Sequence, residues 1–424
     1  MSINLYPDDN ILQEDLITRF FRYTSVSSQS DASSTIVPST PGQRELAELL
    51  KEELTSMGLH NLHLSEYGVL TGYLPKNCKS SIPSMGFCAH LDTVDVGLRP
   101  SIRPQRVTFT GAPICLNKEE QIYLDPAEHP ELLPYKGQEI LVTDGLSVLG
   151  ADNKAAISTI MTALQVLRDT PSLLHGDIYV AFVPDEEIGL VGAKHMDFNR
   201  FPVQFAYTID SCEIGEVVYQ TFNAGQGTLT IEGVSAHPMS AKGVLLNPTL
   251  IAVDFANYFN RLETPENTDG TDGYIWVQAI NSNQRTATVS LNIRDHHKDR
   301  YEAKKAYIRE AVNFLQKRYP RAKLTLTIDD VYGNIEDAIT PDNHYAIDYV
   351  YQAMDRLGIT PKTIAMRGGT DGSYISTQGI PTPNFFTGAH NFHSRNEFLP
   401  LPSFVASCKM ALTLITLTAE QGNA

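Results

Sequence analysis

The apolar positions in the first half of the chain follow two patterns, helical spacing and short continuous runs. Three- and four-residue spacing predicts helices, and short apolar runs between turn residues predict buried strands. The expected helices are Ile11–Tyr23, Gln43–Met57 and Lys154–Leu167. The expected strands are Val69–Leu74, Met85–Ala89, Asp177–Val183 and Gln204–Ile209. Strands that alternate with helices predict an α/β domain with a largely parallel sheet.

The order of elements changes near Gly225 and changes back after Tyr332. The expected order is strand, helix, strand, strand, helix, strand, which is the order of a ferredoxin-like unit. These elements are Thr228–Glu232, Pro248–Leu262, Tyr274–Ala279, Thr286–Ile293, Tyr301–Tyr319 and Lys323–Ile328. The helix Tyr345–Leu357 and the segment Thr363–Met366 then resume the first pattern. We therefore expect an α/β domain at 1–222 and 332–424, interrupted by a smaller α+β domain at 223–331.

Composition limits the class of protein. The chain has 424 residues, of which 42% are hydrophobic, and this favours two folded domains. A formal net charge of −16 argues against a nucleic-acid or membrane partner. The five cysteines form no CxxC pair, and the first residues lack the pattern of a signal peptide. The apolar segment Phe404–Ala419 is shorter than the roughly 20 residues that a membrane span needs. We interpret that segment as a closing amphipathic helix and expect a cytoplasmic protein.

Acidic residues and histidines stand just after the predicted strands or at the start of a helix. Ligands of open α/β sheets bind beyond the carboxyl ends of the strands, so these side chains are expected to converge. The residues concerned are His90 and Asp92 in CAHLDT, Asp152 in LGADNKAA, Glu186 and Glu187 in VPDEEIG, Asp210 in YTIDS, and His393 in GAHNFHSRNEF. A lone histidine after a strand is more often structural, and a Glu-Glu pair is usually solvated. The interpretation as a site therefore depends on the whole set.

Two histidines with several carboxylates form a donor set suited to zinc, cobalt or manganese. Other hydrolytic and nucleotide-binding motifs are absent from the sequence: it has no HExxH, no GxSxG, no GxxxxGK[ST] and no GxGxxG. The pattern favours a site for divalent metal ions.

The motifs HLDT, LGADNKAA, PDEEIG, TIDS and HSRNEF, in this order, resemble the M20 family of co-catalytic zinc peptidases. The segments GVSAHPMSAKGVLLNP and RGGTDGSYIS are similar to its tripeptide aminopeptidases. The resemblance implies a zinc-peptidase-like α/β catalytic domain with an inserted ferredoxin-like lid domain, and a homodimer formed through the lid. It also implies a small peptide as substrate, cleaved at its N-terminal residue.

The resemblance assigns roles to single residues. One metal ion would bind His90 and Asp210, the other Glu187 and His393, and Asp152 would bridge both. The ions would be zinc, with cobalt or manganese as alternatives, and a water between them would be the nucleophile. Asp92 would orient His90, and Glu186 would be the general base. The family often has a second aspartate where this chain has Asn153.

Three further residues are candidates for contacts with the substrate. The resemblance makes His237 the donor to the scissile carbonyl oxygen, against the alternative of a turn histidine held by Pro238. Arg294 and Arg367 are candidates for the substrate carboxylate, because guanidinium groups bind carboxylates bidentately. An ordinary structural ion pair is the alternative for each arginine.

Two other functional hypotheses remain open. The first is a different M20 activity, such as a dipeptidase, a carboxypeptidase or an N-acyl-amino-acid deacylase. The second is a non-catalytic metal- or peptide-binding protein, which would be expected to lack Glu186 or a ligand; the sequence has them all.

Overall fold

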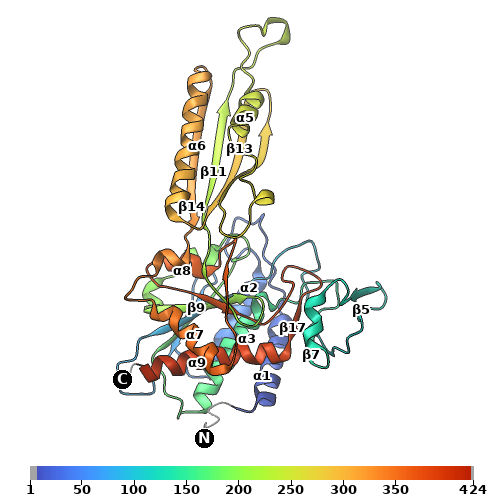
Figure 1. Ribbon diagram of the computed structural model, residues 1–424, viewed down its shortest axis with the longest axis vertical. Helices are drawn as coiled ribbons and strands as arrows, with labels where there is room; N and C mark the ends of the chain where they lie inside the picture. Colours follow the sequence, from blue (N-terminus) through green and yellow to red (C-terminus); the bar gives the residue numbers. More distant parts are fainter. Residues whose placement is uncertain (1–6, 422–424) are drawn as a thin grey trace. The chain divides into compact units, whose positions relative to one another are not determined.

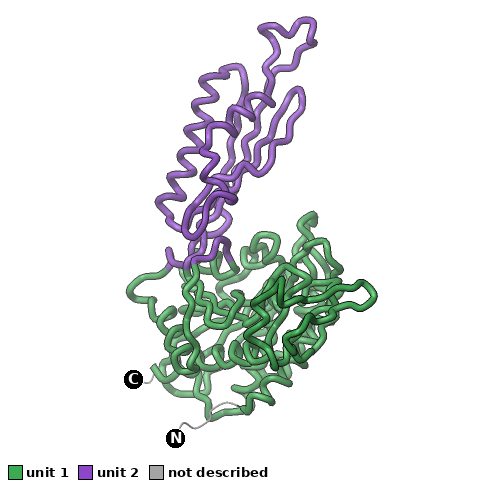
Figure 2. Tube along the Cα trace, turned by 45° about the vertical axis from the view of Figure 1, so that its right-hand side comes forward, with its two compact units in different colours: residues 1–219, 339–364, 370–424 green, residues 220–338, 365–369 purple. Residues whose placement is uncertain are grey.

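The computed structural model describes residues 7–421 of the chain. The first six residues, on which the expected lack of a signal peptide partly rests, lie outside this range. The chain divides into two compact units, coloured in Figure 2. Unit 1 comprises residues 1–219, 339–364 and 370–424, and unit 2 comprises residues 220–338 and 365–369.

Unit 1 is built on an eight-stranded sheet. In sheet order its strands are β1 (His60–Leu64), β2 (Leu70–Leu74), β8 (Ile178–Val183), β3 (Met85–His90), β9 (Phe205–Ser211), β16 (Asn384–Phe386), β10 (Glu216–Gln220) and β15 (Lys362–Ala365). The four central strands β8, β3, β9 and β16 run parallel. The pairs β1–β2, β2–β8 and β10–β16 are antiparallel, so the expected parallel sheet is found only at the centre. The α/β class is confirmed.

Both faces of the central strands are buried, which explains their continuous apolar runs. On β3, Phe87 and Ala89 belong to the main core, whereas Cys88 belongs to a second core on the other face. Helix α3 packs against β3 and β9, and α8 packs against the same two strands. The helices of unit 1 are α1 (Asp9–Thr24), α2 (Pro41–Ser56), α3 (Ala151–Asp169), α4 (Val191–Lys194), α7 (Tyr345–Leu357), α8 (Asp371–Thr377) and α9 (Leu401–Gln421), with 3-10 turns η1 (Pro130–Tyr135) and η2 (Phe198–Arg200). Figure 1 shows these elements on the chain.

The closing helix differs from the expectation. Helix α9 has 21 residues, so it is longer than the predicted segment 404–419. Among residues 7–421 it is the one helix long and apolar enough to cross a membrane, and 83% of its most apolar window is buried inside the fold. It packs against α1, α3 and α7. The helix is therefore a core helix of unit 1 and not an amphipathic one.

A small all-β region of unit 1 was not predicted. It contains a three-stranded sheet and a separate hairpin with short, partly exposed strands. These strands are β4 (Gln105–Thr108), β7 (Glu139–Val142) and β17 (Phe398–Pro400) in the sheet, and β5 (Ile114–Asn117) and β6 (Ile122–Leu124) in the hairpin. Because β17 pairs with β7, this region is attached to the segment that carries His393.

Unit 2 is a four-stranded antiparallel sheet with strand order β12-β13-β11-β14. Its helices α5 and α6 pack against the sheet, and the sequence of elements is that of a ferredoxin-like unit. The elements are β11 (Asn223–Glu232), α5 (Pro248–Ala256), β12 (Tyr274–Ser282), β13 (Thr286–Asp295), α6 (Lys298–Arg318) and β14 (Lys323–Tyr332), with 3-10 turns η3 (Pro238–Ser240), η4 (Pro265–Asn267) and η5 (Ile335–Ala338). Helix α5 ends six residues before the predicted Leu262, which is exposed.

Candidate metal centre

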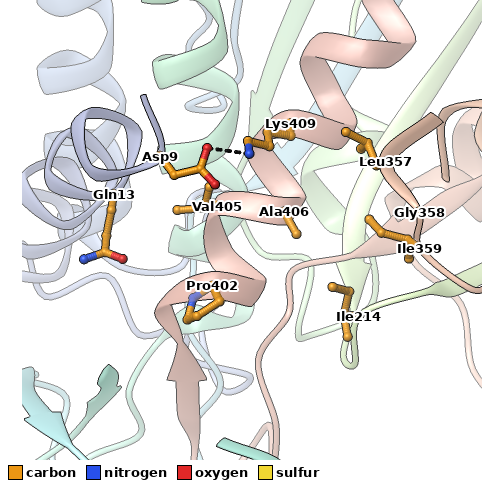
Figure 3. Close-up of a pocket in the computed structure, with 10 residues that line it drawn as sticks. All are labelled: Asp9, Gln13, Ile214, Leu357, Gly358, Ile359, Pro402, Val405, Ala406 and Lys409. Atoms are coloured by element: carbon orange, nitrogen blue, oxygen red, sulfur yellow. Dashed lines mark ion pairs between the residues drawn. The ribbon is translucent and has the colours of Figure 1, made fainter. Parts of the chain in front are cut away.

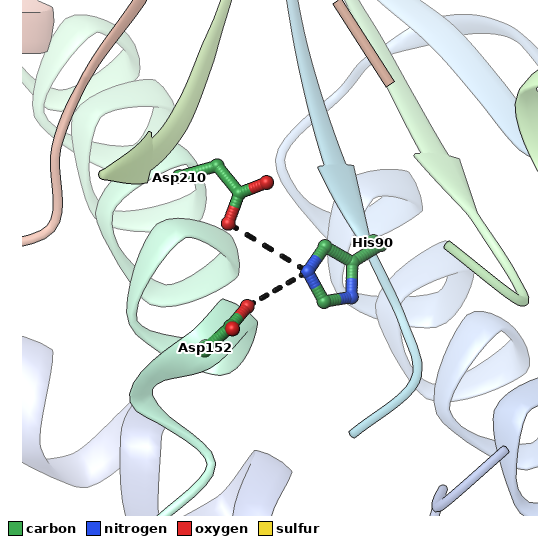
Figure 4. Close-up of side chains that lie close together, drawn as sticks. All are labelled: His90, Asp152 and Asp210. Carbon is green, nitrogen blue, oxygen red and sulfur yellow. Dashed lines mark hydrogen bonds and ion pairs between the residues drawn. The ribbon is translucent and has the colours of Figure 1, made fainter. Parts of the chain in front are cut away.

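Four of the five candidate ligands, and the candidate base Glu186, come from the ends of three parallel strands and the start of one helix, whereas His393 lies in a loop. His90 is the last residue of β3, and Asp210 is the last but one of β9. Glu186 and Glu187 follow β8, and Asp152 lies at the beginning of α3. Figure 4 shows His90, Asp152 and Asp210 facing one another from three different elements.

Asp152 lies between the two histidines. Its Oδ1 is 2.9 Å from His90 Nε2, and its Oδ2 is 3.0 Å from His393 Nε2. Asp210 Oδ1 is 3.8 Å from the same nitrogen of His90, and Glu187 Oε1 is 3.0 Å from His393 Nε2. The structure thus places all five predicted metal ligands in one cluster, with one carboxylate oriented to both sides.

The donor atoms fit divalent metal ions. In each of two groups, one with His90, Asp152 and Asp210 and the other with Asp152, Glu187 and His393, the ligand atoms lie within 4.8 Å of one another. A third group of this kind contains His90, Glu186 and Glu187. Glu187 Oε1 is buried and has no hydrogen bond of good geometry with residues 7–421. Imidazole nitrogens together with carboxylate oxygens suit zinc and similar transition metals better than calcium.

The backbone at the start of α3 sets the direction of Asp152. Gly150 has a left-handed φ of 73°, and a Cβ atom there would lie 2.8 Å from Ile102 Cδ1. Asp152 has φ −83° and ψ 99°, which are not helical values. The next residue, Asn153, is 1% exposed, and its Oδ1 has no partner among the described residues.

Asp92 connects two of the ligand segments. Its carboxylate accepts the backbone N–H groups of Glu186 at 3.0 Å and Glu187 at 3.1 Å. His90 Nδ1 lies 3.1 Å from the backbone oxygen of Asp92 and 3.4 Å from its Oδ1. The backbone oxygen is therefore the nearer acceptor for His90, while the carboxylate holds the Glu186–Glu187 turn. The sequence did not indicate this second contact, because it joins segments 94 residues apart.

Glu397 holds the turn at Asp152 through backbone N–H groups, as Asp92 holds the turn at Glu186 and Glu187. It is 1% exposed, and its carboxylate accepts the N–H groups of Leu149 at 2.6 Å, Gly150 at 2.9 Å and Asp152 at 3.2 Å. Sequence reasoning missed this residue, although it stands in the HSRNEF motif four positions after His393.

The loop that carries His393 is held by side chains of the small β region. His393 and Asn391 both have a left-handed φ of 59°, which is unfavourable for residues other than glycine. Asn391 Nδ2 donates to Glu131 Oε1 at 2.6 Å, and Asn396 Nδ2 lies 2.8 Å from His129 Nε2. These contacts, which we call the loop clamp (His129, Glu131, Asn391 and Asn396), stabilise an otherwise strained backbone.

Burial and the close packing of carboxylates perturb the ionisation of the site. Burial, with a contribution from Asp152, raises the pKa of Asp210 to about 6 and that of Glu187 to about 7. Burial also raises the pKa of Glu186 well above its usual range. The neighbouring carboxylates of Asp152 and Glu187 raise the pKa of His393 to about 10. Without metal ions, protons therefore compete for the same donor atoms.

Asp371 is a further buried carboxylate near this cluster. It is the first residue of α8 and is 2% exposed. Burial raises its pKa well above the usual range, and His90 and Asp210 are close enough to influence it. It stands in the segment RGGTDGSYIS.

The remaining predicted residues belong to unit 2. His237 follows β11 and is exposed, and its Nδ1 accepts the backbone N–H of Met239 at 3.2 Å. It borders a hollow of about 860 Å³ that is also lined by Asn247, Asn283 and Gln284. Because Nδ1 accepts, the neutral ring carries its proton on Nε2.

The two arginines have different surroundings. Arg367 donates to the backbone oxygens of Gly270 and Asp272 and to Thr268 Oγ1, and its guanidinium lies 5.2 Å from the ring centre of Phe222. Arg294 donates to the backbone oxygens of Gly225 and Ile293 through Nη1 alone, and its guanidinium lies 5.7 Å from the ring centre of Tyr332. Nε and Nη2 of Arg294 have no partner among residues 7–421.

A cavity of about 460 Å³ in unit 1 has a different character (Figure 3). Its lining includes Ile214, Leu357, Ile359 and Val405, and its two charged residues, Asp9 and Lys409, form an ion pair with each other. It contains none of the clustered ligands, so it is not a candidate metal site.

The chain matches a family model over residues 126–417, described as peptidase family M20/M25/M40. A peptidase T-like protein of Yersinia pestis is 53% identical over 409 residues, which cover 96% of this chain and 99% of the relative. Peptidase T of Geobacillus kaustophilus is 39% identical, covering 97% of this chain and 100% of its own. The chain belongs to the M20 peptidase family. It is therefore an enzyme of that family, related to peptidase T over nearly its whole length.

Solved structures of several peptidases have the same fold. The aminopeptidase PepT of Bacillus cereus has a TM-score of 0.74 at 20% identity and covers 98% of this chain and 100% of its own. A tripeptidase of Staphylococcus aureus has a TM-score of 0.72 at 20% identity and covers 96% of this chain and 99% of its own. The Bacillus subtilis YXEP protein, a dinuclear metal-binding peptidase of the M20 family, has a TM-score of 0.66 at 12% identity and covers 97% and 99%.

Proposed function

We propose that this M20 peptidase is a two-metal aminopeptidase that removes the N-terminal residue from tripeptides. The observation that carries the proposal is the position of Asp152, whose two carboxylate oxygens face His90 and His393 at 2.9 Å and 3.0 Å. One carboxylate shared by two groups of donors is what a pair of cooperating ions requires. His90 and Asp210 would hold one ion and Glu187 and His393 the other, with zinc as the first choice and cobalt or manganese as alternatives.

Divalent ions at these donors would polarise the scissile carbonyl and lower the pKa of the attacking water. Glu186 accepts the proton of that water and passes it to the leaving nitrogen. The hydrogen bond from its backbone N–H to Asp92 Oδ1 fixes the turn, and its side chain has no partner among residues 7–421. A raised pKa suits this role, because a general base must also give its proton away at neutral pH.

His237 and Arg294 are proposed to bind the substrate. The proton on His237 Nε2 can be donated to the carbonyl oxygen as negative charge develops there. Arg294 has two guanidinium nitrogens left for a carboxylate, whereas both terminal nitrogens of Arg367 already donate within unit 2. We therefore favour Arg294 over Arg367 for the C-terminal carboxylate of the peptide.

A homodimer formed through unit 2, which would act as a lid, is also proposed. Strand β12 is an edge strand, and Trp276 and Ile280 on it are each 38% exposed. Leu250 on α5 is 60% exposed. An edge strand with exposed apolar side chains favours pairing with a second copy. Light scattering of the wild type and of Leu250→Asp tests this, since the change should shift a dimer toward monomers.

The cytoplasm is the proposed location. All five cysteines are free, two of them buried, and none of them forms a disulfide. Such thiols suit a reducing compartment.

Hydrolysis of a peptide panel tests the proposed activity. With zinc, cobalt or manganese supplied, free tripeptides should be cleaved faster than dipeptides, tetrapeptides and N-acetylated peptides. Faster cleavage of acetylated amino acids would favour a deacylase of the same family. Metal binding with no cleavage of any substrate would favour a binding protein.

A further inference from the structure

Asp371 is a buried carboxylate that the chain itself leaves without a partner. Its Oδ1 is fully buried and accepts no hydrogen bond, and its side chain forms no hydrogen bond or ion pair with any residue in 7–421. Asp185, a comparable buried aspartate, accepts the N–H and hydroxyl of Ser39 and the side-chain amide of Gln43. Burying a carboxylate without such donors is costly, so Asp371 is suited to a donor from outside the chain.

The position of Asp371 directs it to the metal centre. Helix α8, which it begins, packs against β3 and β9, the strands that end at His90 and Asp210. A Cβ atom on the next residue, Gly372, would lie 3.2 Å from Thr208 Oγ1, two residues before Asp210. Besides burial, the charges of His90 and Asp210 affect the pKa of Asp371, and the charge of Asp371 affects that of Glu186, in agreement with this position.

Each of the other acids of the cluster already has a contact within the chain or a proposed role. Three carboxylates share the histidines, two more accept backbone N–H groups, and one is the proposed base. Those that contact the histidines are Asp152, Asp210 and Glu187, those that accept backbone N–H groups are Asp92 and Glu397, and the proposed base is Glu186. Asp371 is the one acid of this set, within the described chain, that holds neither a histidine nor a backbone group and has no assigned role.

We propose that Asp371 binds the N-terminal ammonium group of the peptide substrate. This inference rests on the aminopeptidase function proposed above and names the residue that selects a free amino terminus. An ammonium group close to two divalent cations needs an anion beside it, because the ions alone would repel it. A blocked terminus carries no charge and would leave Asp371 buried and unpaired, which explains how the site would reject it.

The test compares two substrates that differ only in the amino group. Trialanine carries the ammonium, and propionyl-dialanine has the same shape with hydrogen in its place. We expect Asp371→Asn to lower kcat/KM for trialanine by about 10²-fold and to leave that for propionyl-dialanine within about threefold, since losing a charged hydrogen bond affects only the charged substrate. If propionyl-dialanine is cleaved too slowly, its inhibition constant replaces kcat/KM. Asp371→Glu, which keeps the charge, should restore part of the preference.

Asp185→Asn is the matched control, because it makes the same change at a buried aspartate whose donors are known. It should lower kcat/KM for both substrates by the same factor. An equal loss for both substrates in Asp371→Asn, or a loss of bound metal, would make Asp371 a structural residue and overturn the inference. An unchanged preference would do the same, because it would mean that Asp371 is a protonated acid packed in the protein. Wild-type enzyme that prefers propionyl-dialanine to trialanine would instead overturn the proposed function itself.

Discussion

Replacing Glu186 by Gln distinguishes the roles of the two adjacent glutamates of the site. The structure makes this necessary, because His90, Glu186 and Glu187 also form a group that could hold a metal ion. In our account Glu187 is a ligand, since its Oε1 lies 3.0 Å from His393 Nε2, and Glu186 is the base. Gln has the shape of Glu and keeps the backbone hydrogen bond from residue 186 to Asp92, so the turn should remain intact.

The size of the effect follows from what Glu186 does. The side chain has no hydrogen bond or ion pair with residues 7–421, so its replacement removes no structural contact and little stability. What is lost is proton transfer, which contributes about 10²–10⁴-fold to turnover. At about 1.36 kcal/mol for each factor of ten, this is about 3–5 kcal/mol of the activation barrier. Metal content should remain that of the wild type.

The assay measures kcat on trialanine together with bound metal for Glu186→Gln and Glu187→Gln. The two variants carry the same chemical change at neighbouring positions, so each is the control for the other. Glu186→Gln should retain both ions and lose turnover, whereas Glu187→Gln should lose affinity for one ion. Near-normal turnover in Glu186→Gln, or loss of an ion from it, would show that the roles are wrongly divided.

Three further results are expected. Metal affinity should rise with pH from about 6 to about 10, because Asp210, Glu187 and His393, with pKa values of about 6, 7 and 10, must lose their protons to bind. Calorimetry in buffers of different ionisation enthalpy should detect proton release, and a flat profile would contradict the assignment. Glu131→Ala in the loop clamp should weaken binding of the ion held by His393 by about 10–100-fold, measured by competition with a chelator, while equal weakening of both ions would point to general destabilisation. His237→Ala should lower kcat by about 10²–10³-fold with metal content unchanged, and an unaltered kcat would remove His237 from the mechanism.

The convergence of the ligands was predictable because the strands that carry them are buried on both faces. The runs before His90 and Asp210 are short and apolar, and parallel neighbours must end at one edge of a sheet. The histidine and carboxylate types then indicated the chemistry. The element order of unit 2 was predictable from the change in periodicity.

Contacts between distant segments were not predictable. Glu397 reaches the turn at Asp152 across 245 residues, and Arg367 reaches Asp272 across 95. Strands of three or four half-exposed residues, such as β4 and β6, show too little periodicity to be identified. Helix α9 was misjudged for a related reason, because burial on all sides removes the polar face that marks a surface helix.

The central claim is that Asp152 joins two metal sites, and a metal titration tests it most directly. Chelated wild-type protein and Asp152→Ala are titrated with zinc, and the number of ions bound per chain is determined by elemental analysis at each point. We predict two ions for the wild type, with activity following the second, and weakened binding of both ions in the variant, because one change removes a ligand from each. Full activity with one ion per chain, or an Asp152→Ala variant that binds two ions as tightly as the wild type, would contradict it.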